Sequence, residues 1–161
     1  MKNHTCCFLG HRKIEKSDKL IFSLKTTIEN LIQQEGVDTF LFGSKSQFNT
    51  LSHEIISELK KAYPAIKRVY VRSHFAEISE DYKNFLLQNY EATYFPKKIL
   101  NAGKSSYVER NFEMIDKSTF CIVYFNKNYS PEDGPRKSGT KIAYDYAIKK
   151  NKKIINVFSK T

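Results

Sequence analysis

Short apolar runs alternate along this chain with longer segments in which apolar residues recur every three or four positions. The short runs are typical of buried strands, and the periodic segments are typical of amphipathic helices. The pattern predicts strands at Thr5–Leu9, Thr39–Phe42, Arg68–Val71, Ala92–Phe95, Thr119–Phe125 and Lys153–Phe158. It predicts helices at Ser17–Gln34, Asn49–Ala62, Glu80–Tyr90, Ser106–Asp116 and Gly139–Lys150.

The segment Thr119–Phe125 reads TFCIVYF and gives the strongest strand signal in the chain. Its near-continuous apolar character is typical of a central parallel strand that is covered on both faces. Strands that alternate with helices build parallel sheets with right-handed crossovers. The sequence therefore predicts an α/β fold, a Rossmann-like, doubly wound, mainly parallel sheet with helices on both faces. We expect a single domain over residues 1–161.

The composition narrows the class of protein. The 161 residues are 40% hydrophobic and 27% charged, with six Gly and four Pro, which excludes wholesale disorder, a coiled coil and a disulfide-stapled mini-protein. The 27 basic side chains outnumber the 17 acidic ones, and the net charge of +10 favours anionic partners such as nucleotides or nucleic acid. For most of the lysines, a solvated surface is the simpler explanation.

Cys6, Cys7 and Cys121 all lie in apolar runs, and no Cys/His spacing fits a metal site. Adjacent residues of a strand point to opposite faces, so Cys6 and Cys7 are not placed to bridge each other. We expect three reduced core cysteines and no metal. Because no stretch is apolar enough for a signal peptide or a membrane span, we expect a soluble, cytoplasmic protein with no membrane partner.

Ligands of open parallel sheets bind outside the carboxyl ends of the strands, so the residues that directly follow the predicted strands are candidates for binding. Glycines there allow close approach of a ligand, and hydroxyls and cations suit phosphate. The first segment also has a structural explanation as a surface turn, and the last has one as a helix cap. The segments are Gly10-His11-Arg12, Gly43-Ser44, Arg72-Ser73-His74 and Ser138-Gly139-Thr140.

The helix predicted from Ser106 carries further candidates. Ser106 and Glu109 have the spacing of a capping box, and Arg110 lies one turn beyond Tyr107 on the same side. Arg110 suits a pocket, and Tyr107 suits either a stacked base or simple packing. Neither the GxGxxG dinucleotide motif nor the GxxxxGK[ST] phosphate loop is present. We expect His53 and His74 to be structural or surface residues.

Four segments, in this order, resemble the SLOG superfamily: FLGHR (Phe8–Arg12), FGS (Phe42–Ser44), YVERNFEMIDKSTFCIVYF (Tyr107–Phe125) and SGTKIAYDYA (Ser138–Ala147). The chain looks most like the bacterial YpsA-like branch of that superfamily, the DUF1273 group. The resemblance covers nearly the whole chain and implies a Rossmann-like fold that binds nucleotides or nucleotide-derived ligands. The superfamily includes cytokinin-activating phosphoribohydrolases and DNA-processing proteins of the DprA type.

The resemblance also implies roles for particular residues. In the superfamily a glycine-rich turn before the last helix holds phosphate, a role that here falls to Ser138, Gly139 and Thr140, across a pocket from Gly10, His11 and Arg12. Arg110 matches an arginine that helps catalysis in the hydrolase branch. The chain departs from that branch where Ala143 replaces its glutamate, and Asp145 points elsewhere on the helix.

Three hypotheses about function follow. The first is a binding module or sensor for a nucleotide-like, phosphorylated ligand without chemistry of its own, with Gly43, Ser44, Tyr107 and Arg110 completing the site. The second is a nucleoside-monophosphate phosphoribohydrolase in which Glu109 or Asp116 replaces the missing glutamate. The third is binding of single-stranded nucleic acid. Analogy with the superfamily further implies a homo-oligomer, and no cofactor other than a nucleotide-like ligand is indicated.

Overall fold

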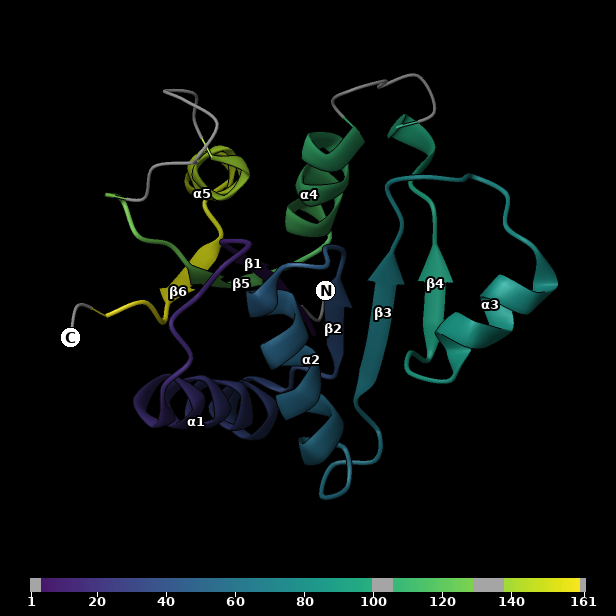
Figure 1. Cartoon of the computed structure of the whole chain (residues 1–161). Coiled ribbons are helices and arrows are strands. Elements are labelled where there is room, and N and C mark those ends of the chain that lie inside the picture. Colours follow the sequence, from purple (N-terminus) through teal and green to yellow (C-terminus); the bar gives the residue numbers. More distant parts are fainter. Residues whose placement is uncertain (1–3, 100–105, 129–137, 160–161) are drawn as a thin grey trace.

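The computed structural model describes residues 4–99, 106–128 and 138–159. In this part of the chain strands and helices alternate, as the apolar pattern predicts (Figure 1). The strands are β1 (Thr5–Gly10), β2 (Thr39–Phe42), β3 (Lys67–Val71), β4 (Ala92–Tyr94), β5 (Phe120–Tyr124) and β6 (Lys153–Asn156). The helices are α1 (Asp18–Glu35), α2 (Gln47–Leu59), α3 (Glu80–Leu87), α4 (Ser106–Asp116) and α5 (Gly139–Lys149), with a short 3₁₀ turn, η1 (Lys97–Ile99), after β4.

The six strands form one parallel sheet in the order β4-β3-β2-β1-β5-β6. The chain first builds outward from β1 to β4 and then crosses back to place β5 on the other side of β1. Cys7 pairs with Cys121 and Gly10 with Tyr124, so β1 and β5 end side by side. The topological switch point, where ligands of such sheets bind, therefore lies between β1 and β5.

Alternating side chains of the strands feed two separate cores. Phe8, Phe40 and Phe42 pack with α1 and α2 on one face. Cys7, Leu41 and Val123 pack on the other face, where the apolar sides of α4 and α5 cover them. Figure 1 shows α1 and α2 together on one side of the sheet, and α3 beyond β4. Strand β5 is buried at every position, which explains why FCIVY is apolar throughout.

Serine side chains cap the N-termini of four of the helices. Each accepts a hydrogen bond from the backbone N–H three residues further on, which satisfies a donor that the first turn leaves free. The capping residues are Ser17 for α1, Ser46 for α2, Ser79 for α3 and Ser138 for α5. Helix α1 ends at Gly36, whose φ of 68° lies in the left-handed region that glycine adopts without strain.

The order and type of the predicted elements are confirmed, but several bounds were wrong. Helix α2 begins at Gln47 rather than Asn49, because Ser46 caps it, and it ends at Leu59. Helix α3 ends at Leu87, three residues early. Ser106, predicted as a capping residue, is itself the first helical residue of α4. The short turn η1 was not predicted, since three residues after a proline give no periodic signal.

The three cysteines are free and buried, as expected. Cys6 and Cys7 belong to opposite cores, which confirms that adjacent strand residues cannot bridge. The Sγ atoms of Cys7 and Cys121 lie 3.6 Å apart, and their hydrogen bond, together with burial, raises the pKa of Cys121. No helix in the described residues has both the length and the apolar character needed to cross a membrane.

Candidate ligand-binding edge

A positively charged side chain follows each of the first five strands within three residues of its end. Because parallel strands end at the same edge of a sheet, the fold brings all five charges to one side of the molecule. None of them forms an ion pair with a carboxylate within the described residues. These residues, called here the carboxyl-edge cations, are Arg12, Lys45, Arg72, Lys97 and Lys127.

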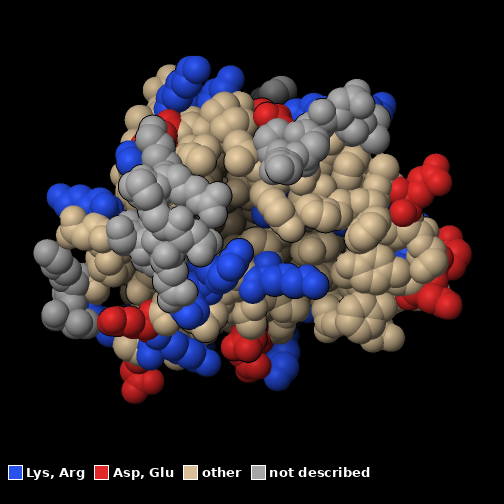
Figure 2. Space-filling model, turned by 45° about the horizontal axis from the view of Figure 1, so that its top comes forward, with Lys and Arg blue, Asp and Glu red and all other residues tan. Residues whose placement is uncertain are grey.

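Figure 2 turns this edge of the sheet toward the viewer. Lys and Arg side chains cross the middle of the face, whereas Asp and Glu side chains lie around its margin. Part of the acidic margin comes from the side of the molecule where α3 begins with Glu80 and Asp81. Such a distribution of charge attracts an anion to the middle of the edge.

The loop after β1 is joined to the loop after β5 at the switch point. The side chain of His11 is only 2% exposed, and its Nε2 atom accepts a hydrogen bond of 2.9 Å from the backbone N–H of Asn126. Burial lowers the pKa of His11, which favours the neutral imidazole that this bond requires. His11 thus orders the loop, while the next residue, Arg12, is exposed at the edge.

The two glycines that end β1 and follow β2 leave room for protein side chains. A Cβ atom on Gly10 would lie 2.3 Å from Cδ2 of Phe48, and one on Gly43 would lie 2.6 Å from Cδ of Arg110. The backbone N–H of Gly43 donates to the side chain of Asn49. Close approach is therefore needed at both positions, as the sequence indicated, but the groups that approach belong to the protein itself.

Arg110 is buried in the same region, with 4% of its surface exposed. Its guanidinium donates to the carbonyl of Gly43 and, at 3.3 Å, to Oγ of Ser73. It also lies 5.5 Å from the ring centroid of Tyr107, so these two residues share a side of α4, as predicted. Burial lowers the pKa of Arg110 to about 10. Its hydrogen-bond acceptors in the described residues are neutral, so its positive charge is not cancelled.

Ser44 and His74 have local partners. The hydroxyl of Ser44 is hydrogen-bonded to that of Ser46, the cap of α2, at 2.9 Å. His74 is exposed, and its ring lies against Tyr107 with centroids 4.8 Å apart. The ring of His53 contacts the backbone carbonyl of Asn89 at 2.9 Å. The two histidines therefore have the structural and surface positions that we expected.

The three residues at the start of α5 have different environments. The hydroxyl of Ser138 accepts a hydrogen bond of 3.0 Å from the backbone N–H of Lys141, so Ser138 is the helix cap. Thr140 is buried. Gly139 is exposed, and a Cβ atom on it would meet no described atom within 4 Å. The capping explanation holds for Ser138, and open space beside Gly139 leaves the N-terminal end of α5 accessible.

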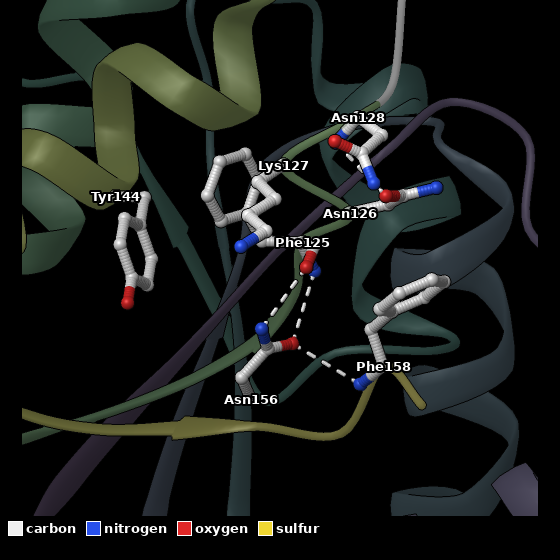
Figure 3. Close-up of a pocket in the computed structure, with 7 residues that line it drawn as sticks. All are labelled: Phe125, Asn126, Lys127, Asn128, Tyr144, Asn156 and Phe158. Carbon is white, nitrogen blue, oxygen red and sulfur yellow. Dashed lines mark hydrogen bonds between the residues drawn. The ribbon is translucent and has the colours of Figure 1, made fainter. Parts of the chain in front are cut away.

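A pocket of about 410 Å³ lies where β5 and β6 end (Figure 3). Three asparagines, three aromatic rings and one lysine surround it, namely Phe125, Asn126, Lys127, Asn128, Tyr144, Asn156 and Phe158. Asn156 shapes it, because its side-chain amide bonds to the backbone N–H and C=O of Phe125 at 3.1 and 3.0 Å. Asn126 connects the pocket to the switch point through His11.

Comparison with protein-family models gives no match to the chain, and comparison with curated proteins gives none either. The fold is Rossmann-like. The resemblance to the SLOG superfamily stays an inference from the sequence motifs.

The carboxylates considered for catalysis do not gather in one place. Glu109 is half-buried in the first turn of α4. Asp116 ends that helix, where it is bonded to Lys98 at 3.0 Å and to the hydroxyl of Tyr146 at 2.8 Å. Asp145 is held by Lys141 at 2.9 Å. No group of His, Cys, Asp and Glu side chains within the described residues could hold a metal ion.

Sequence reasoning missed several residues of the pocket between β5 and β6. It named no candidate between Phe125 and Ser138, and part of that segment lies outside the described residues. The segment Asn126-Lys127-Asn128 gave a usable signal, because polar residues directly after the most apolar strand lie at the ligand edge. Asn156 and Phe158 gave no such signal, because both fall within the predicted strand Lys153–Phe158.

Proposed function

We propose that this protein binds a nucleotide or a related phosphorylated small molecule at the carboxyl edge of its sheet, as a carrier or sensor. The observation that carries the proposal is the set of carboxyl-edge cations, which lack carboxylate partners within the described residues. When such charges lie together without internal counter-ions, binding of an anion lowers the electrostatic free energy. The sequence resemblance to the SLOG superfamily supports the same ligand class.

The pocket between β5 and β6 suits the uncharged part of such a ligand. Its rings offer flat apolar surface, and the side-chain amides of Asn126 and Asn128 offer donors and acceptors for a base or a sugar. Lys127 and the N-terminal end of α5 favour a phosphate group nearby. Arg12, on the other side of the His11–Asn126 bond, extends the positive edge across the switch point.

We propose binding without chemistry, because the hydrolase glutamate is absent and Asp116, one of its two candidate replacements, is held by other groups. Ala143, at the position of the hydrolase glutamate, is buried in the core. Asp116 is held at the end of α4, and its backbone carbonyl accepts from Lys152, which lies just before β6 at the opposite edge of the sheet. Incubation with AMP and IMP tests this directly. Release of ribose 5-phosphate that Arg110→Ala abolishes would favour the phosphoribohydrolase instead.

The first experiment is native mass spectrometry of the freshly purified protein, followed by denaturation and identification of any released small molecule. It is joined by calorimetric titration with AMP and with adenosine, which differ only in the phosphate. We expect AMP to bind more tightly than adenosine by at least about tenfold, because a phosphate gains charge-assisted hydrogen bonds. Equal affinity for the two, or no binding of either together with an empty protein, would contradict the proposal.

Charge-matched variants separate a specific edge from general basicity. Arg12→Ala removes one charge at the switch point, and Lys149→Ala removes one at the far end of α5. We expect the first to weaken AMP binding by about tenfold and the second to change it less than twofold. The same pair tests the nucleic-acid hypothesis. Binding to single-stranded DNA that falls steeply with salt and weakens equally in both variants would favour that hypothesis.

A further inference from the structure

A second pocket lies at the other end of the carboxyl edge, where β3 and β4 end. Its volume is about 410 Å³, and it shares no residue with the pocket between β5 and β6. Two of its lining side chains are cations, two are aromatic and none is acidic; they are those of Arg72, Ala76, Thr93, Tyr94, Phe95 and Lys97. A cavity of this composition has the electrostatic character of an anion site.

The guanidinium of Arg72 has an incomplete set of acceptors. Its Nη1 donates to Oγ1 of Thr93 at 3.0 Å, and its Nη2 donates to the carbonyl of Ala76 at 3.3 Å. Its Nε atom is buried and has no hydrogen-bond acceptor within the described residues. Both acceptors that it does have are neutral, so no described carboxylate balances the positive charge. Burial also lowers the pKa of Arg72, which is the expected result of an uncompensated charge.

The same strand shows what a purely structural arginine looks like in this protein. Arg68, four residues earlier, donates to both carboxylate oxygens of Glu91, at 3.1 and 2.7 Å. Lys60 lies 3.7 Å from the same carboxylate. Within the described residues, the fold therefore supplies a counter-ion to the arginine at the beginning of β3 and none to the arginine that follows its end.

The lysines of η1 show the same contrast. Lys98 lies 3.0 Å from the carboxylate of Asp116 and 3.7 Å from that of Glu113, both on α4. Lys97 is exposed, lines the pocket and has no ion pair in the part of the chain that the structure describes. Of these two neighbouring lysines, Lys98 therefore joins η1 to α4 and Lys97 faces the cavity.

We propose that this pocket is a second binding site, for the oxyanion of a small phosphate monoester. Arg72 and Lys97 hold the phosphate, and the rings of Tyr94 and Phe95 contact the organic group that carries it. The planar guanidinium matches two phosphate oxygens, and Lys97 adds a mobile point charge. This pocket and the proposed nucleotide pocket are lined by different residues at opposite ends of the edge, although Arg72 and Lys97 also belong to the carboxyl-edge cations that support the proposed function.

The test is NMR titration of ¹⁵N-labelled protein with phenyl phosphate, and with phenol as the uncharged control. The readout is the Nε–H signal of Arg72, assigned by its loss in Arg72→Lys. We expect phenyl phosphate to shift this signal and phenol to leave it in place. Lys97→Gln should weaken the apparent affinity by about tenfold, and Lys98→Gln, which removes the same charge from the next residue, should change it less than twofold.

Two results would overturn the proposal: an Arg72 signal that phenyl phosphate does not move, or an equal loss of affinity in the two lysine variants. The same spectra keep the two proposals apart, because the backbone signals of Asn126–Asn128 report the pocket between β5 and β6. Shifts there without a shift at Arg72 would reject the second site and leave the nucleotide proposal standing. Shifts at Arg72 alone would support the second site and count against the first.

Discussion

The two edges of the sheet differ in how the arginines beside β3 are balanced. At the edge where the strands begin, Arg68 and Lys60 share the carboxylate of Glu91, and Lys61 pairs with Glu58. At the edge where the strands end, the carboxyl-edge cations have no such partners within the described residues. Lys67 and Lys153 at the first edge also lack an ion pair within the described residues, so the second edge is distinguished by the gathering of such cations after five strands, which favours a partner from outside.

The carboxyl edge is instead held together by packing and by bonds to the backbone. The ring of Phe48 fills the space beside Gly10, and His11 bonds to the loop after β5. The comparison teaches that a basic net charge says little until the fold shows which charges are already matched. The following predictions test this difference between the two edges, beginning with the largest expected effect.

Gly10→Ala should be the most damaging of the changes predicted here. The new methyl group would lie 2.3–2.6 Å from three carbon atoms of Phe48, which is buried and cannot move without disturbing the core. We expect the free energy of unfolding, measured by urea denaturation, to fall by about 2–3 kcal/mol. The control is Gly139→Ala, where no described atom lies within 4 Å and the change should stay within about 0.5 kcal/mol. Equal losses in both variants would contradict the packing argument.

Glu91→Gln breaks the charge pairing at the edge where the strands begin. Burial alone would raise the pKa of Glu91, but the hydrogen bonds and charge of Arg68 outweigh it and hold the pKa below the ordinary value of 4.5. The pair therefore stabilises the fold above that pH and ceases to do so as the pH falls through the lowered pKa. We expect Glu91→Gln to lower the free energy of unfolding by about 1–2 kcal/mol near neutral pH and by progressively less in acid.

The matched change at the other edge is Arg72→Gln in the ligand-free protein. It removes no ion pair in the part of the chain that the structure describes, so the free energy of unfolding should change by less than about 1 kcal/mol. A loss as large as that of Glu91→Gln would show that Arg72 is structural, and would remove the contrast between the two edges.

His11 should make stability depend on mild acidity. Burial lowers its pKa below the ordinary value of 6.5, so the folded state disfavours protonation, and stability falls as the pH drops below about 6.5. Protonation would also cost the bond from Asn126. His11→Gln keeps an acceptor without a charge, and we expect it to flatten the pH profile of unfolding by about 1 kcal/mol. The control, exposed His74→Gln, should leave the profile of the native protein unchanged; a flattening there of the same size would refute the assignment.

The smallest effect should come from Lys61→Gln. Lys61 and Glu58 lie 3.1 Å apart, but both side chains are largely exposed, so water and salt screen their attraction. We expect a change in unfolding free energy below about 0.5 kcal/mol that shrinks further in high salt. A larger cost would mean that charge pairing at this edge matters even without burial.

Much of the fold could be predicted from the sequence, because it depends on local periodicity. The apolar alternation predicted the order of strands and helices, and the predicted helix Ser17–Gln34 ends one residue before the observed end of α1 at Glu35. The start of α2 was harder to predict, because the sequence alone does not distinguish a serine that caps a helix from the helical residues that come before Asn49. The short η1 turn gave no periodic signal at all.

For the candidate site, too, part could be predicted from the sequence and part could not. The sequence alone determined that glycines, cations and hydroxyls follow the strands, and that the chain carries a net charge of +10. Only the tertiary structure decided that Gly10 and Gly43 accommodate Phe48 and Arg110. It also decided that Arg68 has a carboxylate partner whereas Arg72 has none within the described residues. The physical reason is that periodicity is a property of neighbouring residues, whereas the counter-ion of Arg68 lies 23 positions away, on the loop before the next strand, and is brought to it only by strand pairing.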